Sequence, residues 1–189
     1  MATPKVKSDL STINTSAINS IKLRVEDNSR IVDDIVNEIV SPYVKDLDRY
    51  VQFIKNCLKD GENPPTDYEL EDFLMNLSTD IYFASGMSEQ LGIRDDIAKA
   101  VYKETYNSVR DSTVGGTIAD KNVQAELESQ QEQLISICYT RAYRVVKAKV
   151  ESAQELLSSC KKVLSRRMSE QQLTQMTGNV GSRRSGYED

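Results

Sequence analysis

Positively charged side chains gather in two short stretches near the C-terminal end of the chain, "YTRAYRVVKAK" at 139–149 and "CKKVLSRRM" at 160–168. In a helix that turns about 100° per residue, six of these cations fall within one arc of roughly 160°. These six, here called the basic face, are Arg141, Arg144, Lys147, Lys161, Lys162 and Arg166. Lys and Arg clustered on one helix face are the usual electrostatic footprint of a nucleic-acid-binding protein. The spacing therefore predicts contacts with a phosphate backbone, and an affinity that falls steeply with salt.

Other charges in the same region weaken this prediction. Lys149 and Arg167 fall inside the apolar arc of the helix, where they could snorkel, mark a subunit boundary or indicate a bent helix. Glu151 and Glu155 lie on the basic face, and Lys147 to Glu151 is an i, i+4 pair that would partly neutralise it. A second interpretation stays open, in which these cations only complement the dipole at the C-terminal end of a solvated helix.

Two tyrosines stand beside the first cations of the basic face. Tyr139 and Tyr143 are one helical turn apart and alternate with Arg141 and Arg144, an arrangement that could stack bases while phosphates are held. Both lie at the border of the apolar arc, which favours packing against a neighbouring helix.

The chain has few residues suited to catalysis or metal binding. It contains no histidine, which removes the commonest general base and the usual zinc ligand. The three cysteines, Cys57, Cys138 and Cys160, lack zinc-site spacing, and their odd number argues against a disulfide framework. We expect each of them in the core of a protein from a reducing cytoplasm.

Paired carboxylates and a double glycine offer no better catalytic motif. The "DD" pairs at 33–34 and 95–96 point about 100° apart in a helix, so they are expected to be solvated charges and not metal ligands. "VGGT" at 114–117 lacks the spacing of a phosphate-binding loop and is expected to be a hinge between helices. We therefore expect no enzymatic activity, cofactor or metal, with a carboxylate and metal hydrolase as the minor alternative.

Composition indicates which elements carry these side chains. Of 189 residues 28% are charged, whereas glycine and proline number only 8 and 4, a balance that favours long helices. No apolar run reaches the length of a signal peptide or of a membrane span, so we expect no membrane contact and a cytoplasmic location. The predicted fold is all-α, an elongated helical bundle with coiled-coil-like seams and a long C-terminal helix.

Hydrophobic periodicity and capping residues predict about five helices within a helical domain at 15–168. The first helix is expected to be weak around Asn28. Ser41 and Pro42 are expected to start the second helix, and Thr66 with Glu69 forms a capping box for the third. The expected ranges are 16–40, 41–61, 66–84, 93–111 and about 119–168, with Gly86 and Gly92 interrupting the middle. Residues 1–14 are expected to be a flexible arm and 169–189 a disordered tail.

Charge is distributed unevenly over this domain. Residues 67–132 carry 14 acidic and 5 basic groups, whereas 133–189 carry 5 acidic and 10 basic groups. Although the net charge is −5, the basic last third could still bind a polyanion.

A small all-helical chain with an acidic middle and a long C-terminal helix containing "YTRAYRVVKAKV" and "CKKVLSRRM" resembles the bacteriophage recombination mediator proteins. The resemblance implies a helical homo-oligomer that binds single-stranded DNA in the host cytoplasm. It also implies help in loading a recombinase onto strands coated by single-strand binding protein, hence a non-enzymatic accessory factor of recombination or replication. No site residue is carried over from that family.

A structural or assembly protein, such as a virion component or scaffold, is the alternative function. Its helical seams would join the copies, and the basic face would meet an acidic protein surface, such as residues 67–132, without binding nucleic acid.

Overall fold

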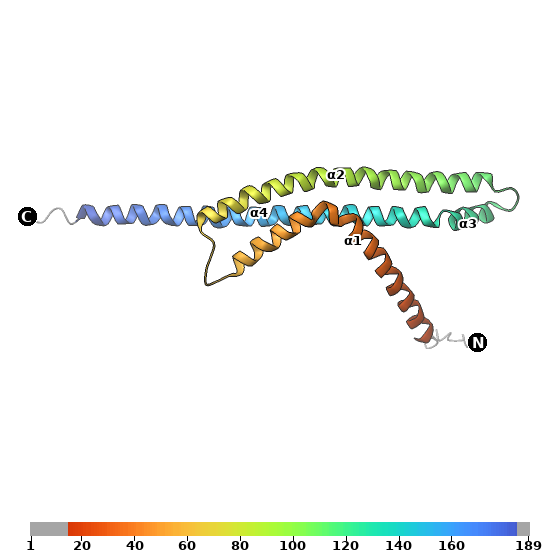
Figure 1. Ribbon diagram of the computed structural model, residues 1–189, viewed down its shortest axis with the longest axis horizontal. Helices are drawn as coiled ribbons and strands as arrows, with labels where there is room; N and C mark the ends of the chain where they lie inside the picture. Colours follow the sequence, from red (N-terminus) through yellow and green to blue (C-terminus); the bar gives the residue numbers. More distant parts are fainter. Residues whose placement is uncertain (1–14, 185–189) are drawn as a thin grey trace, which may run out of the picture.

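The computed structural model describes residues 15–184, and the side chains of residues 18–176. This range forms four helices and no strand: α1 (Thr15–Lys59), α2 (Asp67–Ser112), α3 (Ile118–Glu128) and α4 (Gln130–Arg184). The predicted all-α class is confirmed, as is the long C-terminal helix of an elongated bundle (Figure 1). The predicted flexible arm at 1–14 and the last residues, 185–189, lie outside the described residues.

The bundle is built around α4. Helix α2 runs antiparallel to α4 along much of its length, and the second half of α1 lies against both of them (Figure 1). Helix α3 is a short element at the far end, packed mainly on α2. The C-terminal end of α4 extends past the start of α2, and the N-terminal part of α1 projects away from the bundle.

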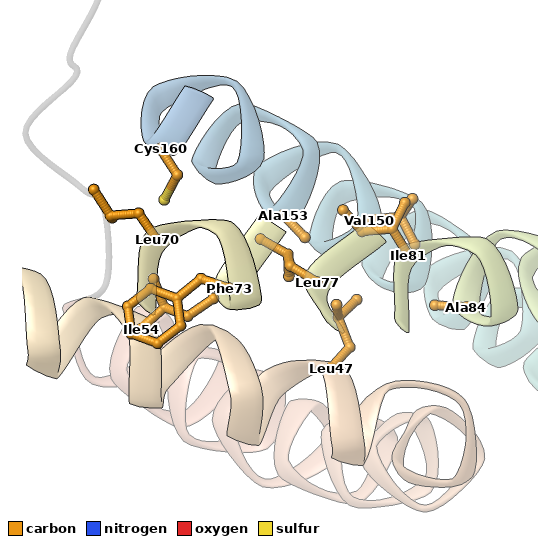
Figure 2. Packing of buried hydrophobic residues seen from close by; sticks show 10 residues of the cluster. All are labelled: Leu47, Ile54, Leu70, Phe73, Leu77, Ile81, Ala84, Val150, Ala153 and Cys160. Atoms are coloured by element: carbon orange, nitrogen blue, oxygen red, sulfur yellow. The ribbon is translucent and has the colours of Figure 1, made fainter. Parts of the chain in front are cut away.

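Two clusters of buried side chains hold the three long helices together. The first joins the start of α2 to the middle of α4 and the end of α1, and Figure 2 shows it: Leu47, Ile54, Leu70, Phe73, Leu77, Ile81, Ala84, Val150, Ala153 and Cys160. The second lies nearer the start of α4: Val36, Val40, Val44, Leu91, Cys138, Ala142 and Val146. Most successive members on one helix are three or four residues apart, the spacing of the coiled-coil-like seams that the sequence predicts.

The first two predicted helices are one continuous helix. Ser41 and Pro42 do not start a new element, because α1 runs through both residues. Figure 1 shows α1 bent where it crosses α4, as expected when a proline removes one backbone hydrogen bond from a helix. Val40 and Val44 flank the proline and are both buried in the second cluster, so packing holds the helix together across the break.

The predicted interruption of α2 is also wrong. Gly86 and Gly92 both lie within one helix of 46 residues, so residues 66–84 and 93–111 are not separate elements. A Cβ atom at position 92 would lie 3.3 Å from the ring of Tyr143, so this glycine lets α4 approach α2 closely. The predicted capping box of α2 is confirmed, since Glu69 and Thr66 bond reciprocally.

The predicted helix at about 119–168 begins and ends elsewhere. Ser129 is buried and divides it into α3 and α4. Both its backbone N–H and its hydroxyl donate hydrogen bonds to the carbonyl of Ala125, at 3.1 and 2.7 Å. Helix α4 then continues past Met168 to Arg184, through residues 169–184 that were expected to be disordered. Gln171 donates a hydrogen bond to Asp67 at the start of α2, which anchors this extension.

The double glycine forms the expected hinge. Gly115 and Gly116 connect α2 to α3 with φ values of 84° and 76°, which glycine adopts without steric cost. Thr117 and Asp120 then form a second capping box at the start of α3.

Leu77 tests the contribution of the first cluster to stability. This side chain is fully buried between the three long helices, so Leu77→Ala leaves a cavity and should lower the free energy of unfolding by about 2–5 kcal/mol. Urea denaturation followed by circular dichroism measures the change. Met75→Ala, at an exposed position two residues away, is the matched control and should change stability by less than about 0.5 kcal/mol. Equal effects of the two substitutions would contradict the packing described above.

Candidate nucleic-acid interface

Helix α4 positions all six residues of the basic face. No glycine or proline occurs between Gln130 and Thr177, so nothing local interrupts the helix. Cys138, Ala142, Val146, Ala153 and Cys160 form its buried side. The opposite side carries the basic face, and Arg141, Arg144, Lys147, Lys161, Lys162 and Arg166 are all exposed. The break at Ser129 precedes them, so one unbroken helix holds the whole set.

Two other cations of α4 have a structural role. Lys149 forms an ion pair with Asp48 of α1. Arg167 donates a 2.6 Å hydrogen bond to the carbonyl of Pro65 and pairs with Asp67 at 3.3 Å, at the start of α2. These are the two cations that fall inside the apolar arc, and they cross-link α4 to its neighbours. They are therefore not part of a surface open to a polyanion.

Most of the basic face, in contrast, forms no ion pair with the other described helices. Arg166 pairs with Glu170 at 2.8 Å, within α4 and with both side chains more than half exposed, so the pair is weak. Among the described residues none of the other five cations forms an ion pair, and Lys147 does not pair with Glu151. Apart from Asp95, whose charge interacts with that of Arg144, the acidic residues of α2 thus leave the positive charge of the basic face exposed to solvent.

The basic face consists of two groups. Arg141, Arg144 and Lys147 form the first basic group, and Lys161, Lys162 and Arg166 form the second. The 14 residues from Lys147 to Lys161 separate them by about 21 Å at 1.5 Å per residue, and the exposed Glu151 and Glu155 lie in this interval. A phosphate backbone would therefore meet two positive patches and not a continuous track.

The tyrosines beside the first basic group belong to the bundle. Tyr139 and Tyr143 are half-buried and pack on the second core cluster, as their place at the border of the apolar arc favours. The ring of Tyr143 lies over Gly92 of α2. The alternative of a base-stacking platform is thus less favoured, and the candidate interface consists of charges.

A buried carboxylate lies behind the first basic group. Asp95 of α2 is almost fully buried, accepts a 2.6 Å hydrogen bond from the hydroxyl of Thr140 in α4, and pairs with Lys99 at 2.6 Å. Burial opposes its ionisation, but the hydrogen bonds from Lys99 and Thr140, together with the charges of Lys99 and Arg144, outweigh burial and lower its pKa. Because Thr140 directly precedes Arg141, this contact fixes the rotation of α4 that turns the first basic group outward.

The prediction that both "DD" pairs are solvated is wrong for Asp95. Asp33, Asp34 and Asp96 are exposed, but Asp95 is not. A signal was present in the sequence, since Ser88, Leu91 and Asp95 continue the three-and-four spacing of the buried side of α2.

The remaining candidate groups for chemistry are in the interior. Cys138 and Cys160 are buried in the two clusters, as predicted, and burial raises the pKa of both thiols. Cys57 is partly buried beside the first cluster. The part of the chain that the structure describes contains no group of three or more side chains that could ligate a metal. It also contains no helix long and apolar enough to cross a membrane.

Comparison with known proteins gives no relative: no protein-family model, curated protein or solved structure matches this chain.

Asp95 generates a prediction about stability and pH. Its folded-state pKa lies below the ordinary value of 3.8, so the ionised carboxylate stabilises the fold above that pH, and this contribution is lost as the pH falls through the folded-state pKa. Asp95→Asn should lower the free energy of unfolding at pH 7 by about 1–3 kcal/mol, because a charged hydrogen-bond acceptor is removed. Below about pH 4 the difference from the wild-type protein should shrink.

Thermal unfolding between pH 3 and pH 7 measures both effects. Asp96→Asn, at the exposed neighbouring position, is the matched control and should follow the wild-type curve. A pH-independent difference between Asp95→Asn and the wild-type protein would show that the carboxylate charge is not what stabilises this contact.

Proposed function

We propose that this protein is a non-enzymatic accessory factor of recombination or replication that binds the phosphate backbone of single-stranded DNA through the basic face of α4. The proposal rests on one observation: the cations of α4 fall into two groups with different contacts. Lys149 and Arg167 hold α1 and α2, whereas the six cations of the basic face are exposed, and within the described part of the chain Arg166 alone among these six forms an ion pair. Exposed, clustered Lys and Arg are the footprint of nucleic-acid binding.

The geometry favours DNA binding that depends little on the base sequence of the DNA. The basic face spans about 38 Å from Arg141 to Arg166 at 1.5 Å per residue. Since Tyr139 and Tyr143 pack within the bundle, phosphate contacts would supply most of the binding energy, and such contacts carry no sequence information. The preference for a single strand, and a recombinase or single-strand binding protein as partner, rest on the resemblance to phage recombination mediators.

Charge reversal combined with a salt titration tests this function. Fluorescence anisotropy with an unstructured single-stranded oligonucleotide should give a logarithmic affinity that falls with salt at a slope of up to about −4, if six phosphates are contacted. R141E/R144E/K147E and K161E/K162E/R166E should each weaken binding and reduce the size of that slope by about 2. The same titration with a duplex of equal length measures strand preference.

A matched variant controls for total charge. K45E/K55E/K59E changes the net charge by the same amount at exposed positions of α1 and should bind with a slope close to that of the wild-type protein. If all three variants weaken binding equally, the basic face is not the site. The proposal would be overturned if the wild-type protein does not bind the single-stranded oligonucleotide at low salt.

Assembly remains the second candidate function, and one observation favours it. Large apolar side chains are exposed along the part of α1 that projects from the bundle, among them Ile21, Val25 and Ile31.

A further inference from the structure

The outer part of α1 extends beyond the bundle and leaves several large apolar side chains exposed among the described residues. Residues 18–35 are here called the projecting segment. Its outer part runs away from α4 in Figure 1, whereas Val32 and Ile35 at its base are half-buried and pack against the second cluster. Ile21, Val25 and Ile31 have 57%, 57% and 55% of their surface exposed, although the second half of the same helix is buried by the core. An isolated helix of this length is marginally stable in water, so its apolar side needs to be covered.

Most apolar residues of this segment form a heptad row, in which Leu23 and Ile31 take no part. Alternating steps of three and four, the a and d positions of a coiled coil, give the series Ile18, Ile21, Val25, Asn28, Val32 and Ile35. The row continues on the same side of the helix into Val36 and Val40, which are buried against α4. The seam that joins α1 to the bundle therefore extends past the end of the bundle, with one polar position, Asn28, near its centre.

A groove at the base of the projecting segment continues this apolar surface. It lies between α1 and the start of α4, has a volume of about 560 Å³, and is lined in part by Ile31, Val32, Leu134 and Ile137. Leu134 and Ile137 remain exposed by 40% and 44%, so this surface can accept a further helix. A partner that follows the heptad row from its outer end would reach this groove.

The charges of the segment indicate the direction of a partner with the same sequence. Its outer half, residues 18–26, carries Lys22, Arg24 and Glu26 for a net charge of +1, whereas its inner half, residues 27–35, has a net charge of −2 from Asp27, Arg30, Asp33 and Asp34. Two copies in parallel would place like charges together, but an antiparallel pair places the basic end of each copy beside the acidic base of the other. The row therefore favours a second copy in reversed orientation.

The reversed orientation also matches the heptad row to itself. In an antiparallel pair each a position faces a d position of the partner. The layers are then Ile18 opposite Ile35, Ile21 opposite Val32, and Val25 opposite Asn28. The two-fold axis repeats the same three layers with the two copies exchanged. The two layers that contain Asn28 are adjacent at the two-fold axis, so the two amides come within reach of each other. The two bundles then lie at opposite ends of the pair and do not compete for space.

We infer that the projecting segment of α1 is a homodimerisation surface, in which two copies of residues 18–35 pair antiparallel around Asn28 and each reaches the groove between α1 and α4 of the other. A polar residue at one core position of such a row typically specifies register at a cost in stability. The inference does not depend on DNA binding, and its tests contain no nucleic acid.

Sedimentation equilibrium of the full chain at micromolar concentration is the first test. The wild-type protein should give twice the monomer mass of 21.3 kDa, and I21D/V25D should give the monomer mass. Leu23→Asp is the matched control, because Leu23 is equally exposed but lies on the opposite side of the helix, and it should remain dimeric. A monomeric wild-type protein, a dimeric I21D/V25D variant or a monomeric Leu23→Asp variant would each overturn the inference.

Disulfide trapping tests the direction of the pair and does not depend on the folding of the charged variants. In a Cys57→Ser background the two remaining cysteines, Cys138 and Cys160, are buried. I21C/V32C should form covalent dimers under mild oxidation, whereas Ile21→Cys and Val32→Cys alone should remain uncrosslinked. Rapid crosslinking of the Ile21→Cys single variant would demonstrate a parallel pair and so contradict the antiparallel assignment. A double variant that does not crosslink would also contradict it.

Discussion

The structure depends on the burial of one narrow side of a very long helix. Along α4 the fully buried positions are small or medium side chains, Cys138, Ala142, Val146, Ala153 and Cys160, and they let α1 and α2 approach closely. Gly92 serves the same purpose from the α2 side, where it receives the ring of Tyr143. Because a three-helix contact covers only about half of the circumference of α4, the other half must stay in water, and it carries the charged residues.

Electrostatic contacts then fix the rotation of α4 within that contact. Asp95 and Thr140 bond across the α2–α4 interface, and Lys149 and Arg167 pair with carboxylates of α1 and α2 at two further points along the rod. A rotation of α4 would break these bonds as well as the apolar packing. The same contacts that stabilise the bundle therefore orient the basic face outward, and the proposed DNA-binding surface is a consequence of how the core is built.

The proposed DNA-binding surface and the proposed dimerisation surface lie on different parts of the molecule. The basic face lies on the middle and C-terminal part of α4, whereas the heptad row of residues 18–35 lies on the part of α1 that leaves the bundle. An antiparallel pair of such segments would set two basic faces on one particle. Two linked sites bind a long strand more tightly than either alone, which would allow modest phosphate contacts to act together.

The sequence by itself determined the helical class, the seams of the core, the capping box at Thr66 and the composition of the basic face, because periodicity and local hydrogen bonding are properties of neighbouring residues. Only the tertiary structure decided where a helix runs through a residue that could end it, and where one stops without such a residue. Packing against α4 carries α1 through Pro42 and α2 through Gly92, whereas the buried Ser129 ends α3 without any glycine or proline. The tertiary structure also decided which lysines of α4 cross-link the helices and which stay exposed to solvent. Lys149 and Lys147 are two residues apart, but the former meets Asp48, 101 positions away in the chain, and that contact is invisible to any local pattern.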